Sequence, residues 1–309
     1  MSFTSTVKEE ITRLENNKLE LIAELSAILR NNANVDNDIV ITIENNAVAR
    51  RIFKLLKTIY DVTPNITIRK RYNFNNNYSY ILKIKNKKDI ILDDLSIVID
   101  NIYQNIPKSY ILNDEECLRA YLRGIFIATG SINDPKTSRY HLEFIVNNNE
   151  YASFISSLLN KFHLNSKVIK REKNYMVYIK EAEKISDFLR IINSYNGVMY
   201  FEDIRIYRDH KNMSNRLNNC EQANIDKIFQ TAARQLKDIE VLKENDVLDV
   251  LDEKLLEVIK YRELYPESSL QELSEVMSNE LGYEITKSGL NHRFRKIKEI
   301  ASRLIEEIK

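Results

Sequence analysis

The sequence predicts an α+β fold, in which a duplicated mixed domain with pseudo-two-fold symmetry is followed by an all-α domain. Two observations predict the duplication: one order of helices and strands occurs twice, with a period of about a hundred residues, and each copy opens with an apolar helix that carries small residues at matching places. A third observation, a change of composition after residue 213, predicts that a different domain follows.

The bulk composition suits a globular protein of several domains. At 309 residues and 36.4 kDa, with 43% hydrophobic and 29% charged residues, the chain is long enough for two or three cores. The net charge of +1 indicates no partner, so any basic site is local. Cys117 and Cys220 lie far apart, which argues against a zinc site or a disulfide framework and fits a reducing cytosol. Without a membrane-length apolar run or a signal-peptide pattern, we expect a cytoplasmic protein with no membrane partner.

The first copy opens with the apolar helix Leu25–Ala33. Hydrophobic periodicity then predicts alternating strands and helices. These are a strand at 39–44, a helix with Val48, Ile52, Leu55, Leu56 and Ile59 on one face, strands at 66–71 and 80–85, and a short helix near 92–99.

The second copy opens with Leu122–Gly130 and repeats that order. It contains a strand at 141–146, a helix with Phe154, Ile155, Leu158 and Leu159, strands at 168–171 and 175–180, and a helix at 185–192. Any α/β protein offers helices and strands in some order, but here order, spacing and local residues agree. We therefore predict one domain over residues 1–213, with halves at about 1–105 and 106–213 and a four-stranded sheet in each.

Small residues in the two apolar helices predict that their backbones pack closely side by side, because small side chains allow a short distance between helix axes. The residues are Ala27, Ala33, Gly124, Ala128 and Gly130. The larger apolar residues would anchor each helix to its own half. These are Leu25, Ile28, Leu29, Leu122, Ile125 and Phe126.

The two helices resemble the paired LAGLIDADG helices of homing endonucleases. The resemblance implies an acid that binds the catalytic metal at the eighth motif position, where this chain has Asn32 and Thr129. Metal-dependent cleavage needs carboxylates, and neither residue supplies the negative charge. We therefore expect a LAGLIDADG-like scaffold with no catalytic residue, no metal and no cofactor. Asp134 is an alternative acid, but its place before Pro135 is typical of a turn residue.

Basic residues on the predicted strands leave two interpretations of the sheet surfaces open. They are Arg69, Arg71, Lys83, Lys85, Lys170 and Lys180. Such residues can form a basic saddle that binds DNA, or they can protect exposed strand edges, as surface lysines commonly do. Whether the duplicated domain binds DNA, a protein or a small molecule stays open, and no small-molecule substrate is evident.

The charge pattern changes sharply towards the end of the chain. Residues 214–246 are predicted as a helical linker and 247–309 as a terminal domain. The segment Val241–Glu280 carries eleven acids and four basic residues, whereas Lys287–Lys298 carries five basic residues and no acid. This reversal indicates an interface, with a solvated face as the alternative.

Three helices are predicted in the terminal domain. The first spans Asp252–Leu264, and Ser269-Leu-Gln-Glu272 has the capping-box pattern that begins a second. The third begins near Thr286 or Ser288. Its apolar face is expected to hold Leu290, Phe294, Ile297 and Ala301.

A basic third helix after two short ones matches helix-turn-helix design, in which the last helix enters the major groove of double-stranded DNA. We place the motif at about 269–302. Residues near the start of the third helix are the candidates for reading base edges: Ser288, Asn291, His292 and Arg295. The phosphate-binding candidates are Lys287, Arg293, Lys296 and Lys298. A basic helix that only covers a surface is the alternative.

A degenerate LAGLIDADG pair followed by a helix-turn-helix resembles the WhiA family of bacterial regulators. The matching strings are Met1–Glu10, Leu122–Pro135, Asn215–Asn224 and Lys287–Ile297. The resemblance implies a non-enzymatic, nucleoid-associated DNA-binding regulator of cell division and chromosome segregation, with transcriptional control of sporulation in some lineages. RNA polymerase or another regulator is a further candidate partner. The competing hypotheses are a division factor that acts mainly through protein contacts and a residual metal-dependent DNA endonuclease.

Overall fold

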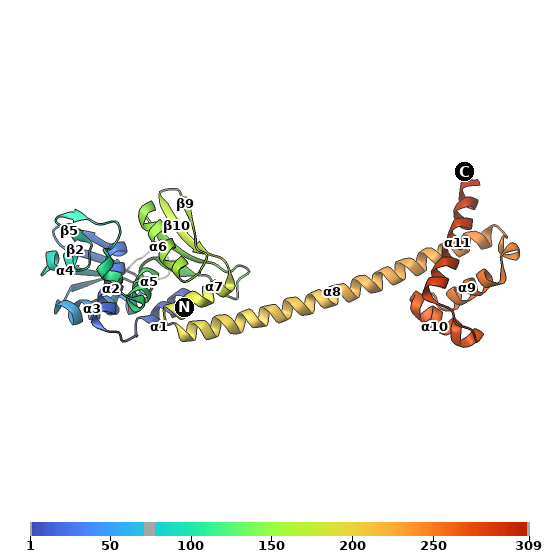
Figure 1. Ribbon diagram of the computed structural model, residues 1–309, viewed down its shortest axis with the longest axis horizontal. Helices are drawn as coiled ribbons and strands as arrows, with labels where there is room; N and C mark the ends of the chain where they lie inside the picture. The colour runs from blue at the N-terminus through green and yellow to red at the C-terminus, as the bar shows by residue number, and fades with distance from the viewer. Residues whose placement is uncertain (1, 71–77, 308–309) are drawn as a thin grey trace. The chain divides into compact units, whose positions relative to one another are not determined.

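The computed structural model describes residues 2–70 and 78–307, so Arg71 lies outside the described residues. The chain divides into two compact units, Met1–Arg208 and Asp209–Lys309 (Figure 1). No helix of the described residues is long and apolar enough to cross a membrane.

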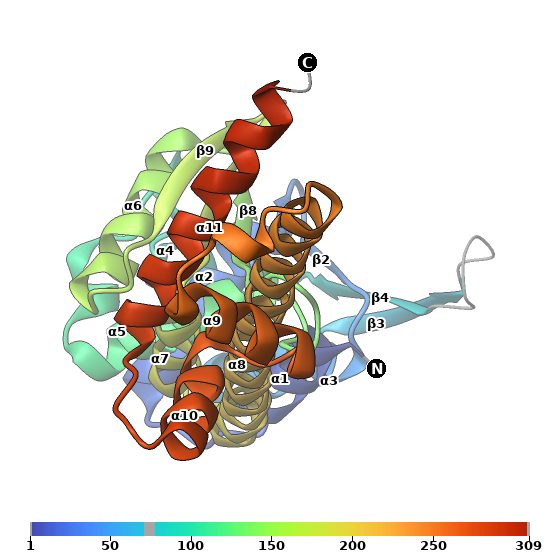
Figure 2. The same cartoon turned by 90° about the vertical axis from the view of Figure 1, so that its right-hand side faces the viewer.

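The first half of unit one is an antiparallel sheet covered by helices. Its elements are α1 (Phe3–Ile11), α2 (Lys18–Asn32), β1 (Ala33–Val35), β2 (Ile39–Ile43), α3 (Asn46–Tyr60), β3 (Asn65–Lys70), β4 (Tyr78–Ile84) and α4 (Lys88–Asp94), followed by a hairpin of β5 (Val98–Ile99) and β6 (Ile102–Tyr103). The strand order in the sheet is β1-β2-β4-β3, and β3 and β4 lie side by side in Figure 2.

The second half repeats this arrangement. After the short 3-10 helix η1 (Ser109–Leu112) come α5 (Glu115–Thr129), β7 (Gly130–Ile132), β8 (Leu142–Val146), α6 (Asn149–Lys161), β9 (Lys167–Arg171), β10 (Asn174–Ile179) and α7 (Ala182–Ile191). Its strand order, β7-β8-β10-β9, is the order of the first sheet. The predicted duplicated α+β fold is therefore confirmed, with four strands in each half.

The differences from the sequence prediction lie in short elements. The first strand of each sheet, β1 or β7, has three residues and follows directly on a motif helix. A strand that short shows no alternation of apolar and polar residues, so the sequence did not reveal it. The helix expected near 92–99 is wrong in extent, because α4 ends at Asp94 and residues 98–99 pair with 102–103 as a hairpin.

The motif helices α2 and α5 pack against each other as predicted, and Gly124 explains how they approach. A Cβ atom on Gly124 would lie 2.4 Å from the carbonyl oxygen of Glu24 and 2.8 Å from the Cβ of Ala27. The reason given for Gly130 is wrong: an added Cβ would meet Phe126 of its own helix, 2.2 Å away, rather than α2. The predicted anchor residues of both helices are buried.

Unit two is a small helical domain. The helix expected at 214–246 is the later part of a longer one, α8 (Tyr195–Glu244), which is followed by η2 (Leu248–Val250), α9 (Glu253–Leu264), α10 (Leu270–Leu281) and α11 (Lys287–Glu307). Figure 2 shows α9, α10 and α11 grouped together. The core of unit two joins residues of these helices to Ile239 and Leu242 of α8. The end of α8 is therefore part of this domain rather than a free linker.

Candidate nucleic-acid interface

The start of α10 is fixed by the predicted capping box. The Ser269 hydroxyl accepts a hydrogen bond from the Glu272 N–H at 3.1 Å, and the Glu272 carboxylate accepts one from the Ser269 N–H at 2.7 Å. At its other end, Gly282 has φ +74°, a left-handed conformation that closes a helix readily when the residue is glycine.

Helix α11 begins after Thr286, one of the two predicted caps. The Thr286 hydroxyl accepts a hydrogen bond from the Gly289 N–H at 3.1 Å. The predicted apolar face is confirmed, because Leu290, Phe294, Ile297 and Ala301 are all buried in the core of unit two. Burial of this face fixes the rotation of α11 and therefore decides which residues remain on its outer side.

The outer side of α11 carries most of the residues that the sequence suggested for DNA. The exposed ones are Lys287, Ser288, Asn291, His292, Arg295, Lys296 and Lys298. They carry positive charge and amide, imidazole and hydroxyl groups, which can donate hydrogen bonds to bases or phosphates. The surface has the chemical character that a DNA-reading helix needs.

Arg293 differs from the other candidates because it packs inward. Its side chain is 18% exposed, and Nη1 lies 3.9 Å from Glu257 Oε2 on α9. The same carboxylate accepts a hydrogen bond from the Tyr283 hydroxyl at 2.7 Å. The sequence prediction treated Arg293 as a surface cation; the structure places it in a cluster that joins α9 to α11.

A cavity of about 350 Å³ adjoins the start of α11, and sequence reasoning missed it. It is lined by Lys227, Ile228, Thr231, Arg262, Ser268, Ser269, Leu270, Gln271 and Lys287. No acidic side chain among the described residues lines it. The cavity brings together residues from α8, from the α9–α10 connection and from α11, so local sequence patterns could not identify it.

The floor of this cavity contains a buried cation, Arg262, which is only 1% exposed. Its Nη1 donates to the Ser268 carbonyl at 2.7 Å, its guanidinium lies over the Phe294 ring, and its Nε has no partner among the described residues. Burial lowers the pKa of Arg262, but an arginine stays protonated at neutral pH. Arg262 therefore gives the cavity a fixed positive charge.

The beginning of α10 adds backbone donors to the same cavity. The first N–H groups of a helix have no acceptor inside it. The capping box occupies the N–H groups of Ser269 and Glu272, which leaves those of Leu270 and Gln271. Together with Lys227 and Lys287, these donors favour an anion the size of a phosphate group.

The motif positions Asn32 and Thr129 are the last residues of α2 and α5, respectively. The Thr129 hydroxyl donates back to the Ile125 carbonyl at 3.2 Å, within its own helix. Asp134 accepts a hydrogen bond from the Lys136 N–H at 2.9 Å, which is the turn role expected of it. Within residues 2–70 and 78–307, no group of three His, Cys, Asp or Glu side chains is arranged to hold a metal.

The basic strand residues belong to both sheets, and the pairing of Arg69 with Ser79 places Arg69 on the same face of the first sheet as Lys83. Lys83 pairs with Asp38 at 2.8 Å, and the Lys180 ammonium lies over the Tyr178 ring. Lys170 has the same parity along β9 as Val168, which pairs with the buried Val177, so it points towards the helix-covered face. The uncovered face of this sheet instead has an apolar cross-strand row of Ile145, Met176 and Ile169, which is flanked by Lys167 and Arg171.

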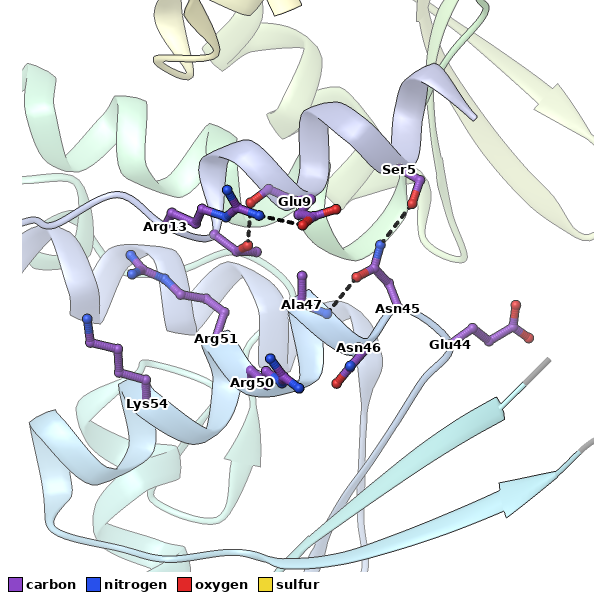
Figure 3. Close-up of a pocket in the computed structure, with 11 residues that line it drawn as sticks. Ser5, Glu9, Arg13, Glu44, Asn45, Asn46, Ala47, Arg50, Arg51 and Lys54 are labelled. Atoms are coloured by element: carbon purple, nitrogen blue, oxygen red, sulfur yellow. Dashed lines mark hydrogen bonds and ion pairs between the residues drawn. The ribbon is translucent and has the colours of Figure 1, made fainter. Parts of the chain in front are cut away.

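Another cavity, of about 550 Å³, lies between α1 and α3 and is shown in Figure 3. Two of its cations are paired within the protein: Arg13 pairs with Glu9, and Arg51 is held by the buried Glu24. Asn45 caps α3 and also donates to the Ser5 hydroxyl at 3.2 Å. The residues around this cavity join α1 to α3, and we assign it a structural role.

Comparisons with known proteins agree with this architecture. Three family models match: the WhiA N-terminal LAGLIDADG-like domain over residues 19–98, the WhiA LAGLIDADG-like domain over 118–211 and the WhiA C-terminal HTH domain over 214–301. Proteins named "Probable cell division protein WhiA" from Bacillus cereus (strain B4264) and Bacillus mycoides (strain KBAB4) are each 45% identical, over 98% of this chain and 97% of theirs.

Solved structures show the same likeness. Full-length DUF199/WhiA from Thermatoga maritima is 25% identical with a TM-score of 0.58, over 98% of this chain and 99% of that one. The N-terminal LAGLIDADG domain of DUF199/WhiA gives a TM-score of 0.51 at 21% identity, over 62% and 90% of the two chains.

The fold and the terminal helices thus define a class of protein in which a duplicated LAGLIDADG-like scaffold is joined to a helix-turn-helix domain. The match at 45% identity over nearly the whole length is more specific than that class. The chain belongs to the WhiA family.

Proposed function

We propose that this protein is a non-catalytic DNA-binding regulator that reads double-stranded DNA with α11. The observation that carries the proposal is the exposed side of α11, which presents basic and amide side chains. This side adjoins a cavity that no acidic side chain of the described residues lines. In helix-turn-helix proteins the second helix of the motif lies in the major groove, and residues near its amino end contact base edges.

The residue types on α11 indicate which residues would contact bases and which would contact phosphates. Asn291 suits adenine and Arg295 suits guanine, because each can form two parallel hydrogen bonds to those bases. Ser288 and His292 lie on the same exposed side and complete the set of base-reading candidates. Lys296 and Lys298 lie further along the helix and would contact phosphates.

The cavity beside α11 would hold a phosphate of the DNA backbone. Lys227 and Lys287 supply positive charge at the wall of the cavity, and the buried Arg262 adds a further positive charge. A phosphate there would accept hydrogen bonds from the start of α10 and fix the register of α11 on the duplex. This arrangement would make the late part of α8 a component of the DNA-binding surface.

The absence of catalysis rests on the motif positions. Asn32 and Thr129 provide no carboxylate at the positions where the LAGLIDADG resemblance implies a metal-binding acid, and Asp134 is engaged in a turn. The name shared by the relatives supports a role in cell division. Chromosome segregation, transcriptional control of sporulation, nucleoid association and a partnership with RNA polymerase or another regulator are finer proposals that rest on the family resemblance.

The test is duplex binding as a function of salt, measured over a panel of sequences. We expect Lys296→Ala to lower the slope of log affinity against log salt by about 0.9, the value for one lost phosphate contact. Arg295→Ala should reduce sequence preference by about 1–3 kcal/mol at one base pair. Lys260→Ala on α9 is the matched control, because Lys260 is exposed and lies outside α11 and the cavity.

Unchanged binding in both α11 variants would contradict the assignment of α11 as the reader. A wild-type protein that binds no duplex would favour a division factor that acts through protein contacts. With magnesium or manganese, we expect the DNA to remain intact. Nicking that Asp134→Ala abolishes would show instead that the protein is a nuclease.

A further inference from the structure

A second polar cavity, of about 240 Å³, lies in unit one where the motif helices α2 and α5 end. It is lined by Arg30, Asn31, Tyr103, Asn105, Thr129, Ile145, Val146, Asn147, Asn148 and Tyr151. These residues come from both halves of the duplicated domain, so the cavity exists only because the halves pack together. Its volume is below the roughly 300–1,000 Å³ of cavities that bind drug-sized ligands, which indicates a smaller occupant.

Arg30 is the only charged side chain that lines this cavity within the described residues. It is 7% exposed, and its two Nη groups donate to the carbonyls of Gln104 and Ser96. Its Nε has no hydrogen-bond partner in the described part of the chain. A buried cation in a cavity with no lining carboxylate favours an anionic ligand, and each Nη of Arg30 has a second N–H beyond the one donated to a backbone carbonyl.

Neutral hydrogen-bonding groups surround Arg30. The Tyr151 hydroxyl lies 3.1 Å from the Tyr121 hydroxyl and 3.1 Å from Asn31 Nδ2. Burial raises the pKa of Tyr151, so its hydroxyl remains a neutral group that can donate. The amides of Asn105, Asn147 and Asn148 line the rest of the wall. Amides both donate and accept, which suits the hydroxyl groups of a sugar.

The start of α6 faces the same cavity through Asn148 and Tyr151. Asn148 caps this thirteen-residue helix by accepting from the Glu150 N–H at 2.8 Å. The amino end of a helix stabilises negative charge. A carboxylate is also near, because Glu150 accepts a hydrogen bond from Asn105 at 2.8 Å, but it is exposed and does not line the cavity.

We propose that this cavity binds a small sugar phosphate, with its phosphate at Arg30 and the start of α6 and its hydroxyl groups on the asparagine amides. Duplex DNA is a poorer fit for this position. The sheet surface next to the cavity has the apolar row Ile145, Met176 and Ile169 between the flanking Lys167 and Arg171, and aliphatic side chains offer no hydrogen bond to a phosphate backbone. The site is independent of the DNA-binding surface proposed for α11.

The full-length protein tests the proposal by isothermal titration with ribose 5-phosphate, inorganic phosphate and ribose. We expect ribose 5-phosphate to bind with the highest affinity, inorganic phosphate more weakly and ribose not measurably. Arg30→Gln should weaken ribose 5-phosphate by about tenfold or more, because it removes a charge-assisted contact. Asn147→Ala should weaken it less, and Asn149→Ala is the matched control, since Asn149 is exposed on α6 and does not line the cavity.

Several outcomes would overturn the proposal. One is a wild-type protein that binds none of the three probes. Another is a folded Arg30→Gln variant whose affinity for ribose 5-phosphate is unchanged. The third is an equal affinity for ribose 5-phosphate in Asn147→Ala and Asn149→Ala. If Arg30→Gln does not fold, the comparison of Asn147→Ala with Asn149→Ala tests the proposal instead. Displacement of ribose 5-phosphate by a short DNA duplex, in a protein whose α11 carries Lys296→Ala, would assign the cavity to DNA. An α11 variant that loses DNA binding should bind ribose 5-phosphate with wild-type affinity, because the two sites are independent.

Discussion

Glu24 and Arg51 form a bidentate ion pair beneath the motif helices, with Nε and Nη2 of Arg51 lying 2.8 and 2.9 Å from the two carboxylate oxygens. Both side chains are almost fully buried. Arg123 of α5 approaches the same carboxylate, with its Nε 3.8 Å away. One carboxylate on α2 therefore balances a guanidinium from α3 and another from α5, and so links the two halves of the domain electrostatically.

We expect Glu24→Gln to destabilise unit one by about 3–5 kcal/mol, because it removes the nearest counter-charge of two buried guanidinium groups. Denaturant unfolding followed by circular dichroism measures the loss. Glu9→Gln is the matched control: Glu9 pairs with Arg13 on the surface, where such a pair contributes about 0–1 kcal/mol. Equal effects of the two substitutions would show that the buried cluster has no special role in stability.

The close packing of α2 and α5 gives a second prediction, for Gly124→Ala. The new methyl group would lie 2.4 Å from the Glu24 carbonyl oxygen, so the helices must separate. Overpacking of this kind costs about 1–3 kcal/mol, against a gain of about 1 kcal/mol in helix propensity. We expect a lower melting temperature for unit one in differential scanning calorimetry.

The control for that experiment is Gly289→Ala on α11. The nearest atom to its added Cβ is the Thr286 hydroxyl oxygen, at 3.3 Å, and a side-chain atom can adjust slightly. The gain in helix propensity then decides the sign of the change in stability, so Gly289→Ala should be neutral or stabilising. A Gly124→Ala protein that is as stable as Gly289→Ala would contradict the close helix contact.

Much of the fold was predictable because it rests on patterns that are local in sequence. Alternating apolar residues predicted β2, β4, β8 and β10. The buried side of α11 was predicted by the spacing of Leu290, Phe294, Ile297 and Ala301. The capping box at Ser269 was readable because both partners lie within four residues. Three-residue strands such as β1 carry no such pattern.

The parts of the candidate site that could not be predicted depend on contacts between distant residues. The sequence around Arg293 does not distinguish it from a surface cation. Its partial burial depends on Glu257, which lies on a different helix. Arg262 lies in an acidic stretch of sequence, yet the fold buries it under the start of α10. Lys227 belongs to a helix that the sequence suggested was a linker.

Arg293 gives a third prediction, which separates structure from DNA binding. Arg293→Ala removes packing between α9 and α11 and leaves the Glu257 carboxylate with Tyr283 alone. We expect lower stability of unit two with no change in the salt slope of DNA binding. Duplex titrations below the melting temperature measure the slope. A slope reduced as much as in Lys296→Ala would return Arg293 to the phosphate-binding set.

The capping box gives a fourth prediction, in the pH dependence of unit-two stability. The hydrogen bond from the Ser269 N–H lowers the pKa of Glu272 below its ordinary value of 4.5. A lowered pKa in the folded state contributes stability above pH 4.5, and this is lost as the pH falls through the folded value. The stability advantage of wild type over Glu272→Gln should therefore shrink in acid. An advantage independent of pH would contradict the role of the charge.

The cavity beside α11 gives the last prediction. If a backbone phosphate occupies it, Lys227→Gln should lower the salt slope of duplex binding by about 0.9 and leave sequence preference unchanged, because a phosphate contact carries no base information. Lys254→Gln on α9 is the control, since Lys254 is exposed and does not line the cavity. A Lys227 variant with the wild-type slope would restrict the DNA surface to α11. A lowered slope would instead extend that surface to α8, a helix outside the three-helix motif.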